Sequence, residues 1–170
     1  LCASMKAETK APDPTSVILK RYSEMLVEGK VMDAKEVREH MASISKEGTW
    51  ADVNYKGNDR RDWEPFYHIF RLGYIARAYA KPGHPLHGDK ALLKTIFLGI
   101  DHWLANSYKC PNGWYNTTAT PDHFSKIAVY INDDLTGDRR KGVIAIAGAQ
   151  EGGRKRWATG ANLMHKAQAI

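Results

Sequence analysis

A chain of 170 residues, of which 43% are hydrophobic and 26% charged, is long and apolar enough to fold as one domain around a buried core. No stretch contains the roughly 18 consecutive apolar residues of a transmembrane helix, and two cysteines are too few for a disulfide scaffold. The net charge of +6 favours an anionic partner such as an acidic polysaccharide, a nucleic acid or a membrane surface, although solubility alone also explains such a charge.

Residues 1–14 are polar and close with Pro12 and Pro14, which predicts a flexible N-terminal arm in front of a single domain over residues 15–170. The arm has no basic start followed by an apolar run, so it is not an intact signal peptide. Because the first residue is Leu1 rather than methionine, we interpret the arm as what remains after a signal peptide has been largely removed.

Six segments beyond the arm repeat apolar residues every three or four positions, which is the pattern of amphipathic helices. Asp33, Asp89 and Asp138 are placed to cap three of them, and Gly29 and Gly48 to end the first two. In chain order, the expected helices span about 15–28, 34–47, 65–80, 90–104, 121–130 and 139–149. A further helix is expected to begin in "ANLMHKAQAI", at the end of the sequence.

The stretch "KGVIAIAG", residues 141–148, is apolar enough for a buried strand, but the rest of the sequence offers it no partner strand. We therefore predict an all-α protein with no substantial sheet, in which helices alternate with short and long loops. Helix hairpins are the expected arrangement, although the helices differ too much in sequence to form a recognisable repeat.

The segment "NGWYNTTATP", residues 112–121, is predicted to be a polar loop that carries two large rings, Trp114 and Tyr115. The flat C–H faces of sugars pack on aromatic rings, and the amides of Asn112 and Asn116 offer partners for sugar hydroxyls. The same rings would also stack on nucleic-acid bases, or fold back to cover the core. The segment is thus a candidate ligand platform, with base stacking and core cover as the alternatives.

Three basic clusters accompany this platform: Arg60-Arg61, Arg139-Arg140-Lys141 and Arg154-Lys155-Arg156. Guanidinium groups bind carboxylate or sulfate through paired hydrogen bonds, although such clusters more often form solvated surface. The seven histidines show no metal-ligand spacing with the acidic residues, and the sequence contains no phosphate loop or nucleophile elbow. We therefore expect neither a metal nor a cofactor.

Three motifs, taken together, resemble those of a known family. "GTWADVNYKGNDRRDW" is similar to a Gly-Ser-Trp, Asp, Tyr entry segment, and "HGDKALLKTIFLGIDHWLANSYKCPNGWYNTTATP" is similar to a helix followed by an Asn-Trp-Trp-x-Asn-Glu-Ile-x-x-Pro loop. "ATGANL", residues 158–163, resembles a Thr-Gly-Ala-Asn motif. Their order and spacing, over about residues 48–165, resemble those of polysaccharide lyase family eight, which contains chondroitin AC, hyaluronate and xanthan lyases.

The resemblance implies an (α/α) toroid built of helix hairpins, of which this chain would be an incomplete N-terminal part. It also implies β-elimination: a base removes the C5 proton of a uronic acid, the neutralised carboxylate stabilises the resulting charge, and the glycosidic oxygen leaves with a proton. The asparagine of the family's Thr-Gly-Ala-Asn motif, which bonds the uronate carboxyl, corresponds to Asn162, and the family's stacking tryptophan corresponds to Trp114.

Two departures from the family pattern bear on these expectations. Gly113 stands where the family has the first tryptophan of the loop, and Thr117 and Thr118 replace its Glu-Ile, so the stacking platform is reduced or displaced towards Tyr115. The family's catalytic His, Tyr and Arg follow the Thr-Gly-Ala-Asn helix by many residues, beyond Ile170.

We therefore expect the N-terminal fragment of a secreted or periplasmic bacterial lyase that acts on hyaluronan- or chondroitin-type polysaccharide, with this chain inactive alone. The resemblance assigns a catalytic role to Asn162. The substrate-binding candidates are Trp114, Tyr115, Asn112, Asn116, Arg60 and Arg61. The alternative is a non-catalytic carbohydrate-binding helical domain, and nucleic-acid binding has no motif in its support. Self-association is expected through faces that later hairpins would cover, from about Val143 onward.

Overall fold

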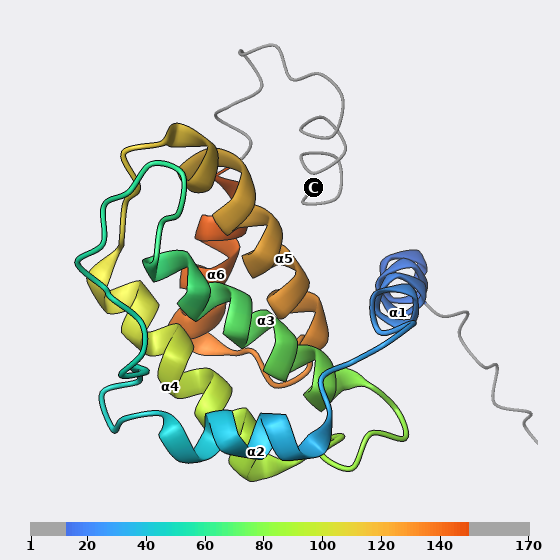
Figure 1. Ribbon diagram of the computed structural model, residues 1–170. Helices are drawn as coiled ribbons and strands as arrows, with labels where there is room; N and C mark the ends of the chain where they lie inside the picture. The colour runs from blue at the N-terminus through green and yellow to red at the C-terminus, as the bar shows by residue number, and fades with distance from the viewer. Residues whose placement is uncertain (1–12, 150–170) are drawn as a thin grey trace, which may run out of the picture.

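The structure, a computed structural model, describes residues 13–149 (Figure 1). Its elements are α1 Pro14–Leu26, α2 Ala34–Ser43, α3 Pro65–Ala80, α4 Lys90–Asn106, the π-helical turn η1 Tyr115–Ala119, α5 Thr120–Tyr130 and α6 Gly137–Gly148. Over this range the only β pairing is an isolated bridge between Ile44 and Trp50. The prediction of an all-α protein without substantial sheet is confirmed. None of the described helices has the length and apolarity needed to cross a membrane.

Two of the predicted N-caps are confirmed by their hydrogen bonds. The Asp33 carboxylate accepts from the backbone N–H groups of Lys35 and Glu36, and the Asp89 carboxylate accepts from that of Leu92 at 2.8 Å. Each bond satisfies an N–H group that the first turn of a helix leaves without an internal partner.

The predicted cap Asp138 is wrong, because α6 begins at Gly137 with Thr136 at the cap position. Asp138 lies inside the first turn and pairs with Lys141 at 2.9 Å. The alternative of a strand over 141–148 is excluded by the same helix. The second helix also ends at Ser43 rather than near Gly48. Gly48 instead has φ +80° in a turn, where a Cβ would lie 2.3 Å from the backbone oxygen of Leu98.

The helices α3 to α6 form two layers, and each helix hairpin contributes one helix to each layer. α3 packs against α5 in one layer, α4 and α6 lie together in the other, and α3–α4 and α5–α6 are antiparallel neighbours (Figure 1). α3 and α4 approach closely at Gly99, where a Cβ would lie 2.7 Å from the Leu72 Cδ2 atom. The fully buried core side chains at this contact include Leu72, Ile96 and Ile100.

The long loop between α2 and α3 is held by a buried polar chain centred on His68. The Trp50 backbone N–H donates to the Tyr55 hydroxyl at 3.1 Å, and this hydroxyl lies 2.9 Å from His68 Nδ1. His68 Nε2 lies 2.9 Å from the Gly99 carbonyl oxygen. Because that oxygen can only accept, the ring carries its proton on Nε2 and accepts from Tyr55 through Nδ1.

α1 lies at the side of the bundle and contributes no fully buried residue. Its C-terminal end is anchored by three long side chains that donate to carbonyl oxygens of the last turn and the residues after it. Tyr130 donates to Leu26 at 3.3 Å, Lys81 donates to Val27 at 2.9 Å, and Arg77 donates to Glu28. These donors satisfy carbonyl groups that the end of a helix leaves without an internal partner.

Candidate functional site

The segment predicted to be an aromatic loop is helical. Residues 113 and 114 already have helical geometry, Tyr115–Ala119 form the π-helical turn, and the chain continues directly into α5. Asn112 starts the segment, because its side-chain oxygen accepts from the Trp114 N–H at 3.1 Å while its amide donates to the Arg60 carbonyl at 2.9 Å. The loop prediction is wrong. Side chains of this segment bind the backbone of the adjoining loop at residues 60 and 61, and these contacts stabilise a helical turn.

The two rings of the platform have different surroundings. Tyr115 packs edge-on against Trp63 and Phe66, with ring centroids 5.5 and 5.1 Å away, and its hydroxyl donates to the Arg61 carbonyl at 3.0 Å. Trp114 keeps 40% of its surface exposed and packs nearly perpendicular to Tyr115, with ring centroids 5.2 Å apart. Tyr115 therefore covers the core, as one of the alternatives predicts, and supports a tryptophan that faces solvent.

Asn116 fixes the backbone that precedes the turn. Its side-chain oxygen accepts from the Cys110 N–H at 2.9 Å, and its amide donates to the Cys110 carbonyl at 2.7 Å. Cys110 is buried with a free thiol. Both ends of the Asn116 amide thus already bind backbone, which leaves it a supporting position beneath the platform.

The structure brings six of the seven predicted site residues to one end of the bundle. The carbonyls of Arg60 and Arg61 accept from Asn112 and Tyr115, which places these exposed arginines beside the turn that carries Trp114. The seventh, Asn162, lies outside the described residues, as do the "ATGANL" motif and the cluster at 154–156.

Sequence reasoning missed an aromatic ridge on α3, made by Tyr67, Phe70 and Tyr74. These side chains are 45%, 41% and 41% exposed. Their spacing of three and four residues is the signal of one helix face, and the opposite face of α3 already supplies the core. Beside the ridge lies a pocket of about 360 Å³ between α3, α5 and the end of α1.

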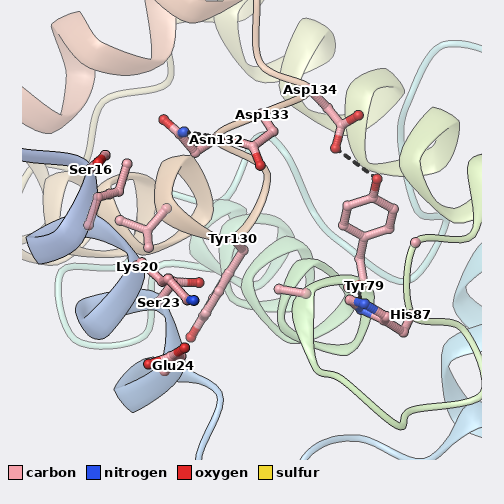
Figure 2. A pocket seen from close by; sticks show the side chains of 14 residues that line it. Ser16, Lys20, Ser23, Glu24, Tyr79, His87, Tyr130, Asn132, Asp133 and Asp134 are labelled. Atoms are coloured by element: carbon pink, nitrogen blue, oxygen red, sulfur yellow. Dashed lines mark hydrogen bonds between the residues drawn. The ribbon is translucent and has the colours of Figure 1, made fainter. Parts of the chain in front are cut away.

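A larger pocket, of about 530 Å³, lies on the other side of α1 (Figure 2). Its lining includes Lys20 of α1 and three carboxylates, those of Glu24, Asp133 and Asp134. The Tyr79 hydroxyl donates to Asp134 at 2.7 Å, and burial together with this bond raises the pKa of Tyr79 to about 12. Carboxylates repel an anionic polysaccharide, so the electrostatics favour the Trp114 end of the molecule for such a ligand.

Comparison with solved structures identifies the class of fold. A chondroitinase AC lyase studied in oligosaccharide complexes superposes with a TM-score of 0.76 at 20% identity, over 91% of this chain and 23% of that chain. A Paenibacillus xanthan lyase gives 0.73 at 21% identity, over 91% of this chain and 16% of the lyase. The chondroitin AC lyase of Streptomyces coelicolor A3 gives 0.66 at 22% identity, over 96% and 22%. The fold is thus the helical fold found in these lyases.

The family follows from sequence. Residues 15–170 match the model of the polysaccharide lyase family 8, N terminal alpha-helical domain, so the chain belongs to polysaccharide lyase family 8. The chondroitinase-AC of Pedobacter heparinus is 26% identical over 95 residues, which are 56% of this chain and 14% of that enzyme. The chain therefore spans about a seventh of the length of this curated relative.

Proposed function

We propose that this chain is the substrate-binding N-terminal part of a lyase that cleaves uronate-containing acidic polysaccharide, of the chondroitin or hyaluronan type, by β-elimination. The observation that carries the proposal is the exposed ring of Trp114, supported by Tyr115 at the end of a family 8 scaffold. Polymeric substrates of this kind lie outside the cell, which favours a secreted or periplasmic location.

The residues around Trp114 supply the chemistry that such a sugar requires. The exposed indole of Trp114 offers an apolar surface to the C–H face of a sugar ring, and Tyr115 packs against this indole. Arg60 and Arg61 are exposed on the adjoining loop, where guanidinium groups can pair with carboxylate or sulfate. Asn112 lies between the ring and the arginines.

The elimination step itself needs more than binding. The C5 proton of a uronate becomes acidic enough only when the carboxylate beside it is neutralised, since the departing proton leaves its electron pair on that group. We assign this neutralisation to the amide of Asn162, on the strength of its place in the "ATGANL" motif. The base and the acid are expected from residues beyond this chain, so the chain alone should bind substrate without turning it over.

Intrinsic fluorescence during titration with chondroitin and hyaluronan oligosaccharides tests the binding role. Of the tryptophans within residues 13–149, Trp50, Trp63 and Trp103 are buried. Trp157 lies outside that range and is replaced by phenylalanine in every protein compared, so a change caused by the ligand reports mainly on Trp114. A saturable change that is lost in Trp114→Ala and largely kept in Trp114→Tyr supports a stacking platform. A change that survives in Trp114→Ala contradicts it.

An elimination assay, which follows the unsaturated product, tests whether this chain binds substrate without carrying the catalytic base and acid. Product formed by this chain alone would overturn the claim that the base and acid lie elsewhere. If a longer form that contains the following part of the protein binds the oligosaccharides but also forms no product, the alternative of a non-catalytic carbohydrate-binding domain is favoured.

A further inference from the structure

We propose that the groove along the α3–α5 seam is a second saccharide subsite, which holds an acidic sugar unit of the same polysaccharide chain that stacks on Trp114. This inference rests on the proposed function. The groove is the 360 Å³ pocket beside the ridge, which is lined by Phe70 and Tyr74 of α3 and bordered by Met25 and Leu26 of α1.

Ring contacts are continuous from Trp114 to this pocket. Trp114 contacts Tyr115, and Tyr115 contacts Phe66 at 5.1 Å between ring centroids. Phe66 is followed on the same face by Phe70 at 6.1 Å, and Phe70 by Tyr74 at 4.8 Å. Within this row Tyr115 and Phe66 are half-buried against the core, whereas Trp114, Phe70 and Tyr74 are exposed. At 1.5 Å of rise per residue, Phe66 and Tyr74 lie about 12 Å apart along α3, so the exposed rings at the two ends of the row are spaced for a chain of sugars rather than for one ring.

His123 of α5 lines the opposite side of the track. Its ring centroid is 5.0 Å from that of Phe66 and 5.3 Å from that of Phe70. The floor between the two helices is therefore aromatic along its length. A polar ligand that also has flat apolar faces, as a sugar has, matches such a floor better than a purely hydrophilic ion does.

Gly73 opens a notch in the groove that the packing of the described residues does not require. A Cβ at Gly73 would meet only His123 Cδ2, at 3.9 Å, which is an ordinary contact. In contrast, a Cβ at Gly99 or Gly142 would lie 2.7 or 2.9 Å from a leucine methyl group. A glycine inside a helix destabilises it by about 1 kcal/mol relative to alanine. Because no close contact among the described residues requires a glycine at position 73, we take its missing side chain as room for a ligand in the groove.

The charges in the pocket match an acidic sugar. Arg77 and Lys126 both line it, as does His123. No ion pair within residues 13–149 involves Arg77, whose contact is with the neutral Glu28 carbonyl, and its buried Nε–H has no hydrogen-bond partner in that range. The Lys126 charge is shared with Asp122, at 2.8 Å. The uncompensated guanidinium charge favours a carboxylate or sulfate, whereas a helix from another protein would bring mainly apolar side chains to this ridge.

Titration calorimetry with chondroitin oligosaccharides of increasing length tests the subsite, because only ligands long enough to pass from Trp114 to the pocket gain from it. Gly73→Leu fills the notch and raises helix propensity, so a loss of binding in this variant does not reflect unfolding. Tyr74→Ala removes one exposed ring. Ile144→Ala, which changes a similarly exposed apolar residue on α6, is the matched control.

We expect the wild-type chain to bind the longer oligosaccharides more tightly than the shorter ones. Gly73→Leu and Tyr74→Ala should each weaken the longer ligands about tenfold, the effect of losing roughly 1.4 kcal/mol at one contact. The shorter ligands and the Ile144→Ala variant should be unaffected.

Three outcomes overturn the inference and separate it from the proposed function. If Trp114→Ala abolishes binding while Gly73→Leu and Tyr74→Ala bind every length normally, the platform stands and the subsite does not. If the wild-type chain binds no oligosaccharide, both fail. If Tyr74→Ala leaves sugar affinity unchanged but converts an associated form to monomer in light scattering, the ridge is a protein contact.

Discussion

Acidification is expected to destabilise this fold through one buried histidine. His68 has no exposed surface, and burial lowers its pKa from 6.5 to about 3. An unfolded chain therefore binds a proton at His68 in the pH range where the folded chain does not. Stability contributed by His68 is present above pH 6.5 and is lost as the pH falls from there towards 3.

The size of the effect follows from the two pKa values. Each pH unit below 6.5 costs about 1.4 kcal/mol, so lowering the pH from 7 to 4.5 should reduce the free energy of unfolding by about 2.5 kcal/mol through His68. His40 and His102, whose pKa values are also lowered mainly by burial, act in the same direction. Asp33 and Asp52, with pKa values below 3.8, stay ionised in this window and do not contribute.

Urea unfolding at pH 7 and at pH 4.5 measures the loss, with His68→Gln as the comparison. The glutamine amide can still donate to the Gly99 carbonyl, but it does not titrate. We expect the variant to be less stable than the wild type at pH 7 and to lose about 2.5 kcal/mol less on acidification. Equal losses in the two proteins would refute the reasoning, because the proton uptake would then belong to other groups.

Three further predictions concern local packing and association. Gly99→Ala should lower the melting temperature, since its Cβ would overlap the buried side chain of Leu72. Gly73→Ala should instead raise the free energy of unfolding by about 0.5–1 kcal/mol. A higher melting temperature in both variants would contradict the close packing at Gly99. Asn116→Ala should cost about 1–3 kcal/mol in thermal unfolding, because the N–H and carbonyl of Cys110 lose their partner, and an unchanged melting curve would show that water replaces it. Self-association through the surface from about Val143 onward stays a prediction: scattering mass should rise with protein concentration, and a strictly monomeric protein at high concentration would count against it.

Helix positions could be predicted where local chemistry decides them. Pro65 begins α3 and Lys81 follows its last residue, as the pattern of apolar residues and the proline indicate. The caps Asp33 and Asp89 are likewise local signals. Asp138 failed as a cap because the choice between neighbouring start positions depends on where α6 packs, which the local sequence does not contain.

The site could be predicted in its residues but not in its shape. Gly113, the asparagines and Pro121 all favour a loop, yet the segment is helical because Asn112 and Tyr115 bind the backbone of residues 60 and 61. Contacts between residues more than 50 positions apart have no local signature. The groove could not be predicted for the same reason, because the exposure of Phe70 depends on which faces of α3 are covered by other helices.

The anchoring of α1 has a consequence for how the protein opens. Because no residue of α1 is fully buried and its fixed points lie at its C-terminal end, its detachment breaks a few hydrogen bonds and leaves the core intact. Amide hydrogens of α1 should therefore exchange with solvent through a local opening of low free energy, well before those of α3 and α5. Met25 and Leu26 of α1 form one wall of the groove pocket, so a ligand in this pocket should slow the exchange of the α1 amides. Hydrogen exchange of a helix that contributes nothing to the core would then report that the ligand is bound.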